Sequence, residues 1–133
     1  MLYHRRYPIE FNHCDPAGIV FYPRYFEMTN HVCENFFREV VGRSFGQMMA
    51  AGTGVPTVHI EVDFRAPSFL DDVLDVSIEV KKLGRSSLTF EIVAACQSQH
   101  RLTVTLIMCW MEGRNAAPWP DEMRSKLAAF MAG

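Results

Sequence analysis

The sequence predicts an α+β protein in which an antiparallel sheet of four or five strands wraps around one long central helix. Apolar residues recur at intervals of three and four over residues 23 to 41, and they alternate with polar residues in several segments after residue 57. The first spacing is typical of a helix with one buried face, and the second of half-buried strands. Because this helix is the only element large enough to cover the sheet, we expect the sheet to pack on it.

The elements of the first half follow from local signals. Residues 3 to 13 begin with polar and apolar alternation and predict a first strand, which the turn from Asp15 to Gly18 stops. The helix over residues 23 to 41 has Pro23 in its first turn and Gly42 at its end, the usual positions of these residues in helices. Residues 43 to 54 predict a short helical connector.

The second half is a series of strands that ends in a helix. Period-two alternation predicts half-buried strands separated by turns, and two prolines precede a terminal apolar stripe. The expected strands cover residues 58 to 65, 74 to 81, 88 to 94 and 102 to 111, and the helix covers about 121 to 131. The free sheet edges and the uncovered sheet face predict a homodimer or a homotetramer.

Composition limits the classes of function. The 133 residues predict a single domain over residues 1 to 133, with 49% hydrophobic residues, 21% charged residues and a net charge of −2. A broadly basic face, and hence nucleic acid as a partner, is not expected. Without a signal sequence or a long apolar run, we expect a cytoplasmic protein without a membrane partner. Four dispersed cysteines without CxxC spacing predict reduced thiols and no metal site.

The residues with the clearest chemistry lie where the turn meets the helix. Asp15 places a carboxylate beside the predicted helix N-terminus. A helix N-terminus offers free backbone N–H donors and a partial positive charge, which a reaction that develops an oxyanion can use. A carbonyl substrate is therefore the first hypothesis. Asp71 and Asp72, in contrast, are expected to start a strand as exposed residues.

The stretch Asp15-Pro16-Ala17-Gly18-Ile19-Val20-Phe21-Tyr22-Pro23-x-Tyr25, followed by a helix and four strands, resembles the 4-hydroxybenzoyl-CoA thioesterase family of the hotdog fold. The resemblance covers nearly the whole chain. Weaker marks are Gly54-x-Pro56, Phe64-x-x-Pro67 with Asp71-Asp72, and Gly84-Arg85-Ser86-Ser87. The resemblance implies hydrolysis of an acyl-CoA substrate, active sites at a dimer interface and no cofactor. The Tyr-Pro-x-Tyr form of the motif is similar to the aroyl-CoA branch of the family.

The resemblance also implies roles for single residues. Asp15 attacks the thioester carbonyl as a nucleophile or activates water as a general base, and the sequence leaves both open. The backbone N–H of Tyr22 donates to the thioester oxygen. From its position next to the loop, His13 is expected to shape the rim of the pocket. In the resemblance, Asn30 stands where 4-hydroxybenzoyl-specific members carry a carboxylate, so the acyl group is left open. Arg85, Ser86 and Ser87 are expected to bind the CoA phosphates, for which a guanidinium is well suited.

Two other functions are compatible with the same fold. A hotdog enzyme that hydrates enoyl thioesters would need a paired aspartate and histidine, and His13 is too close to Asp15 in the sequence to pair with it easily. A protein that binds acyl-CoA without catalysis would keep the pocket and lack turnover. Release of free thiol from a panel of acyl-CoA esters distinguishes the three.

Overall fold

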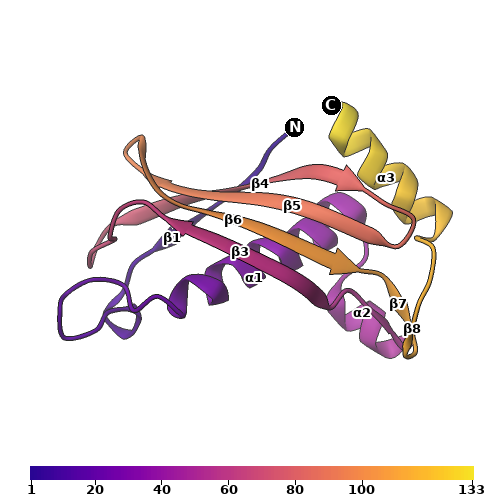
Figure 1. Ribbon diagram of the computed structural model, residues 1–133, viewed down its shortest axis with the longest axis horizontal. Coiled ribbons are helices and arrows are strands. Elements are labelled where there is room, and N and C mark those ends of the chain that lie inside the picture. The colour runs from indigo at the N-terminus through magenta and orange to yellow at the C-terminus, as the bar shows by residue number, and fades with distance from the viewer.

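The sheet is antiparallel and has five strands in the computed structural model, which describes all residues from 1 to 133 (Figure 1). Its order is β1-β4-β5-β6-β3. The bounds of these strands are Tyr3–Pro8 for β1, Thr57–Phe64 for β3, Val73–Leu83 for β4, Ser87–Cys96 for β5 and Gln99–Cys109 for β6. The predicted α+β class and the four strands of the second half are confirmed, with ends that differ by a few residues.

One long helical segment packs on the inner face of this sheet, as predicted (Figure 1). Helix α1 spans Arg24–Phe36 and continues as a π-helical turn over Phe37–Val41, which ends at Gly42 with a φ of 80°. Glycine adopts this left-handed conformation without steric cost, so the helix ends where the sequence predicts. Phe36 and Phe37 are fully buried and meet the ring of Phe90 from β5.

Short elements close the ends of the sheet. Helix α2 (Phe45–Ala50) is the predicted connector, and Ser44 caps it by accepting the N–H of Gln47 at 3.1 Å. The C-terminal helix α3 spans Asp121–Ala132. A second sheet joins β2 (Thr53–Gly54), β7 (Met111–Glu112) and β8 (Asn115–Ala116). No sequence pattern indicates it, because two-residue strands carry no periodicity. None of the helices is long and apolar enough to cross a membrane.

The first strand is shorter than the predicted residues 3 to 13. Strand β1 ends at Pro8, and a 3-10 turn occupies Phe11–His13. The N–H of Glu10 donates to Nδ1 of His13 at 2.8 Å, which folds the chain back on itself. The apolar alternation therefore continues past the end of the strand into a turn.

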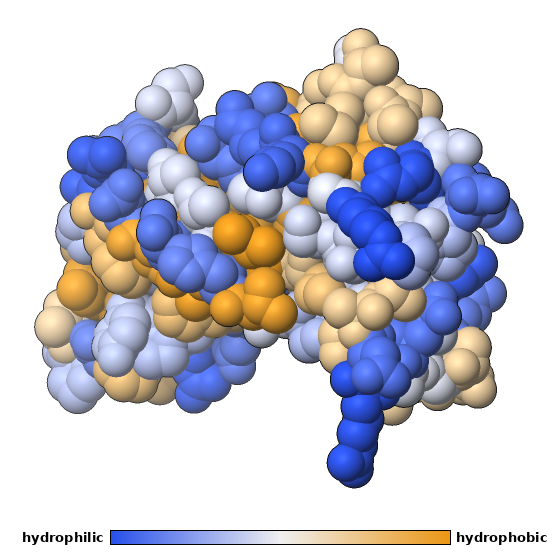
Figure 2. Space-filling model, turned by 45° about the vertical axis from the view of Figure 1, so that its right-hand side comes forward, coloured by the Kyte–Doolittle hydropathy of each residue, from blue (hydrophilic) through white to orange (hydrophobic).

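Strand β3 is the clearest departure from the predicted burial. We expected one face of this strand to be buried, yet Val58, Ile60 and Phe64 are 61%, 44% and 52% exposed. β3 forms one edge of the sheet, whereas α1 packs against β1 and β4 near the opposite edge. Exposed apolar atoms also lie among polar ones on the face shown in Figure 2, where they form a patch near its centre.

Candidate active site

The carboxylate of Asp15 is fixed by a tight turn. The N–H of Gly18 donates to the carbonyl of Asp15 at 2.9 Å, with Pro16 in the second position and Gly18 at a φ of 82°. Aspartate, proline and glycine at these positions are typical of a β-turn. The N–H of Ala17 also donates to Asp15 Oδ1 at 2.9 Å. The turn thus holds one carboxylate oxygen and leaves Oδ2 without a partner in the chain.

The residues around this turn form a small hairpin, which we call the Asp15 loop (residues 13 to 21). The N–H of Asp15 donates to the carbonyl of Ile19 at 3.0 Å, and the N–H of Phe21 donates to the carbonyl of His13 at 2.9 Å. A β-bridge pairs Cys14 with Val20 between them. These cross-links give the loop a defined shape without a long strand.

The loop leads directly into the first turn of α1. Pro23 is the N-cap of this helix, and the N–H of Tyr22 just before it has no hydrogen-bond partner in the chain. This N–H lies one residue before the N-cap, beside the helix end at which backbone N–H groups lack intrahelical partners. The structure therefore supplies a free backbone donor seven residues after Asp15, at the position where the sequence predicts an oxyanion donor.

A cavity of about 410 Å³ opens beside the Asp15 carboxylate. Its lining combines this acid with apolar and small residues: Phe11, Cys14, Pro16, Gly18 and Leu70. Asp15 itself is half-buried. Such a cavity can take a largely apolar group and present a carboxylate to a carbonyl carbon at its wall.

The side chain of Tyr22 contributes an apolar surface next to this loop. Tyr22 is 58% exposed, and its ring packs edge-on against Phe21 and against Phe64 of β3, with ring centroids 5.6 and 6.3 Å apart. The exposed apolar face of the edge strand therefore continues into the start of α1.

His13 lies on a different cavity from Asp15. It lines a polar cavity of about 360 Å³ that also includes Tyr7 and His31. The Tyr7 hydroxyl and His31 Nδ1 are 2.6 Å apart, and partial burial raises the pKa of Tyr7 to about 12. Within one chain the structure does not bring His13 and Asp15 together as a catalytic pair.

Asn30 also lies apart from Asp15 in the same chain. It is exposed on α1 and lines a cavity of about 300 Å³ with Met48, Met49 and Met108. Eight residues of helix separate it from Tyr22, which corresponds to roughly 12 Å along the axis. An amide at the mouth of an apolar cavity can donate or accept one hydrogen bond.

Arg85, Ser86 and Ser87 lie at the turn between β4 and β5, as predicted. Trp110 donates its N–H to the carbonyl of Ser86 at 2.6 Å, and Trp119 donates its N–H to the carbonyl of Arg85 at 3.0 Å. These hydrogen bonds fix the backbone of this turn, and Arg85 is exposed to solvent. Strand β4 has 11 residues and runs from the end of the sheet near Asp15 to this turn, a distance of roughly 33 Å.

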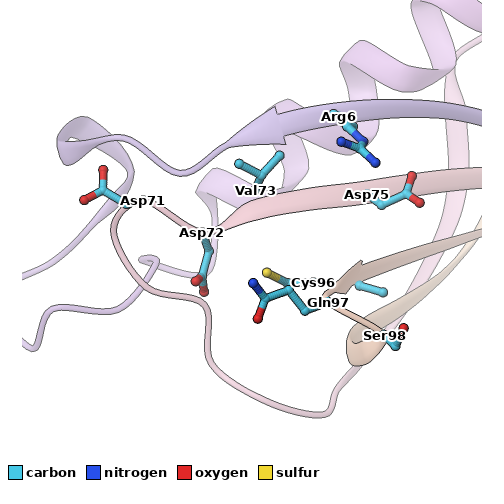
Figure 3. Close-up of a pocket in the computed structure, with 9 residues that line it drawn as sticks. Arg6, Asp71, Asp72, Val73, Asp75, Cys96, Gln97 and Ser98 are labelled. Carbon is cyan, nitrogen blue, oxygen red and sulfur yellow. The ribbon is translucent and has the colours of Figure 1, made fainter.

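Asp72 differs from the exposed residue that the sequence predicts. Asp71 is exposed, but Asp72 pairs with Arg101 at 2.8 Å and its Oδ2 accepts the N–H of Phe69 at 2.9 Å. In Figure 3 the two aspartate side chains leave the chain in different directions. The Phe69 N–H, with Arg101 also contributing, holds the pKa of Asp72 below its usual value although burial opposes this shift. No sequence pattern signalled the partnership, because Arg101 lies 29 residues further along the chain.

The residues of the chain do not form a metal centre, since no three His, Cys, Asp or Glu side chains are grouped to hold an ion. The four cysteines are free thiols, and burial strongly raises the pKa of Cys33.

Comparison with known proteins identifies the family to which the chain belongs. A family model of the thioesterase-like superfamily matches residues 9–127. The 4-hydroxybenzoyl-CoA thioesterase of Pseudomonas sp. (strain CBS-3) is 32% identical over 81 residues, which are 59% of this chain and 57% of that protein. The 1,4-dihydroxy-2-naphthoyl-CoA hydrolase of Synechococcus elongatus is 24% identical over 127 residues, 90% of each chain.

The fold is also shared with solved structures. A 1,4-dihydroxy-2-naphthoyl-CoA thioesterase from Synechocystis superposes with a TM-score of 0.88 at 17% identity, covering 96% of each chain. At this identity the likeness shows the fold, and it agrees with the family match across most of the sequence. The chain therefore belongs to the thioesterase-like superfamily and has its hotdog fold.

Proposed function

We propose that this protein hydrolyses acyl-CoA thioesters, with aroyl-CoA esters as the favoured class, to a free acid and CoA. The observation that carries the proposal is the Asp15 loop, which sets a half-buried carboxylate beside a 410 Å³ cavity and ends at the unpaired N–H of Tyr22. The named relatives act on aromatic CoA esters, which supports the substrate class.

Asp15 has two chemically complete routes. As a nucleophile, its carboxylate oxygen bonds to the thioester carbon, the C–S bond breaks, CoA leaves as a thiolate that takes up a proton, and water then opens the mixed anhydride. As a general base, Asp15 accepts a proton from the water that attacks the same carbon, and the C–S bond again breaks. In both routes the carbonyl oxygen gains negative charge, which the Tyr22 N–H stabilises; one such donor contributes about 3 kcal/mol.

The active unit is a homodimer or a homotetramer rather than a single chain. The length of β4, roughly 33 Å, separates the end of the sheet near the Asp15 loop from the Arg85 turn, so Asp15 and Arg85 of one chain are too far apart to bind the thioester and the phosphates of the same CoA ester. The edge strand β3 exposes Val58, Ile60 and Phe64, an apolar row that a second copy can cover. Arg85, Ser86 and Ser87 of one chain then bind the CoA phosphates of a substrate that reacts at Asp15 of the other.

The two remaining predicted residues, Asn30 and His13, are proposed to act away from the reacting carbonyl. Asn30 is proposed to contact the acyl group from the methionine-lined cavity, and His13 to shape the approach to the site. No cofactor is needed for the proposed reaction, and CoA enters only as part of the substrate. The single domain over residues 1 to 133 and the cytoplasmic location stay predictions from the sequence.

A panel of acyl-CoA and aroyl-CoA esters, with free thiol as the measured product, tests the function. Hydrolysis releases one thiol per ester, and we expect aromatic esters to react fastest. Hydration of an enoyl ester changes its absorbance without thiol release, and binding without turnover changes neither. A panel in which no ester releases thiol overturns the proposal.

A further inference from the structure

The Asp15 loop and the residues that precede it are attached to one other segment, residues 66 to 72, which we call the anchor segment. Before the loop, the N–H of Ile9 donates to the carbonyl of Asp72 at 2.7 Å, and the N–H of Asp71 donates to the carbonyl of Ile9 at 3.0 Å. After the turn, Val20 donates its N–H to the carbonyl of Ser68 at 2.9 Å. A β-bridge also joins Ile19 to Phe69. The position of Asp15 therefore depends on where the anchor segment lies.

The anchor segment is in turn held by one buried arginine. Arg101 Nη1 donates to the carbonyl of Pro67 at 2.9 Å and to Asp72 Oδ2 at 2.8 Å, so it binds both ends of the segment. Its backbone carbonyl accepts the N–H groups of Arg65 and Ala66 at 2.8 and 3.1 Å. The Arg101 side chain is only 8% exposed.

A β-bulge directs Arg101 inward. Ala94 pairs with Leu102 while Ala95 pairs with His100, so Arg101 is an extra residue on β6. In a regular strand Arg101 and Leu102 would point to opposite faces, yet both are buried. Bulges re-aim single side chains and are frequent beside active sites.

We propose that Arg101 and Asp72 are positioning residues for the reaction of Asp15: their ion pair fixes the anchor segment, and the anchor segment fixes the Asp15 loop. This inference rests on the proposed function of Asp15 as the reacting group. Neither side chain lines the cavity beside Asp15, whereas Leu70 of the anchor segment does. The pair therefore acts through the backbone that it holds.

The Arg101 guanidinium is buried while the Asp72 side chain is 24% exposed, and removing a charge from water costs free energy, which favours a positional role for the pair over a stabilising one. Buried ion pairs contribute little net stability compared with apolar residues of similar volume. The only two buried side-chain polar atoms without a partner are Arg101 Nε and Ser68 Oγ, both at this junction. Such buried unsatisfied groups are uncommon in proteins and call for an explanation.

The test compares Arg101→Met and Asp72→Asn with two matched controls. Arg65→Met makes the same replacement at an exposed arginine nearby, and Asp71→Asn makes it at the neighbouring exposed carboxylate. Steady-state kinetics with a reactive aroyl-CoA ester give kcat and KM. Hydrogen-deuterium exchange of the peptides over residues 9 to 21 reports the loop, and exchange over α1 reports the rest of the fold.

We expect kcat to fall about 10²-fold in Arg101→Met, because a small displacement of a reacting group has an effect of this size, while KM changes little. Exchange over residues 9 to 21 rises and exchange over α1 does not. Arg101→Lys restores most of the activity, because both side-chain bonds come from one nitrogen that a lysine can replace. The two control variants match the wild type.

Two outcomes overturn the inference. If the folded Arg101→Met and Asp72→Asn variants keep the wild-type kcat, the pair does not position Asp15; if Arg101→Met does not fold, the kcat of Asp72→Asn decides by the same criterion. Unchanged exchange over residues 9 to 21 also removes the mechanical link. A wild-type protein that hydrolyses no thioester is a different failure, since it removes the proposed function while the exchange data still measure the link.

Discussion

Asp15 Oδ1 accepts the backbone N–H of Ala17 at 2.9 Å, so one oxygen of the carboxylate maintains the turn and the other is available for chemistry. An asparagine can accept the same hydrogen bond through its amide oxygen but is a poor nucleophile and base. The structural and chemical roles of Asp15 can therefore be separated by one substitution.

Asp15→Asn should lower kcat by about 10²-fold to 10⁴-fold while the melting temperature stays close to that of the wild type. Thiol release from an aroyl-CoA ester and thermal unfolding of the same sample measure both. A purified variant with unchanged turnover would remove Asp15 from the mechanism.

Arg85→Ala should raise KM for CoA esters more than it lowers kcat, because the proposed phosphate contact is formed in the ground state and the transition state alike. Arg114 provides a control, since it is an exposed arginine in the short hairpin between β7 and β8. Arg114→Ala should leave both constants unchanged. A loss of kcat at constant KM in Arg85→Ala contradicts the binding role.

A heterodimer of one Asp15→Asn chain and one Arg85→Ala chain should be more active than either variant alone. If the site combines Asp15 of one chain with Arg85 of another, a heterodimer of Asp15→Asn and Arg85→Ala contains one site with both residues intact. Co-expression with two affinity tags and purification on both isolates this species. We expect KM near the wild-type value and about half of the wild-type kcat per dimer; a heterodimer no better than Arg85→Ala alone contradicts a shared site.

Replacing Ile60 by lysine should separate the chains. Ile60 is 44% exposed in the apolar row of the edge strand, and a charge buried against a second copy would be unfavourable. Light scattering should show a smaller assembly for Ile60→Lys. The activity assay should show reduced thiol release by the same variant. His59→Lys changes the neighbouring residue on the other face of β3 and serves as the control; an unchanged assembly in Ile60→Lys places the interface elsewhere.

The phenol of Tyr7 should make stability fall at alkaline pH. Its pKa is raised from 10.0 to about 12, chiefly by burial, so the folded state favours the neutral form. This contribution is fully present below pH 10 and is lost as the pH rises to about 12. In urea unfolding, Tyr7→Phe should lose less stability than the wild type between about pH 10 and 12. Parallel curves for the two proteins would contradict the shift.

The sequence determined the parts of the fold that depend on periodicity and turn residues. The spacing of the aromatic residues and Gly42 located the long helix, and alternation located the main strands. The Asp-Pro-Ala-Gly turn could be predicted because each residue has a local conformational reason to be there. The bulge at Arg101 and the two-residue strands could not, since neither leaves a repeated pattern.

The sequence by itself determined the class of fold, the family resemblance and the candidate catalytic carboxylate of Asp15. Helical periodicity, strand alternation and a turn motif are local properties of the chain. The tertiary structure decided which distant residues meet. It paired Asp72 with Arg101, exposed the apolar face of β3 at the sheet edge, and placed His13 and Asn30 on cavities away from Asp15. These relationships depend on strand order, register and long-range hydrogen bonds, which join segments that the sequence keeps far apart.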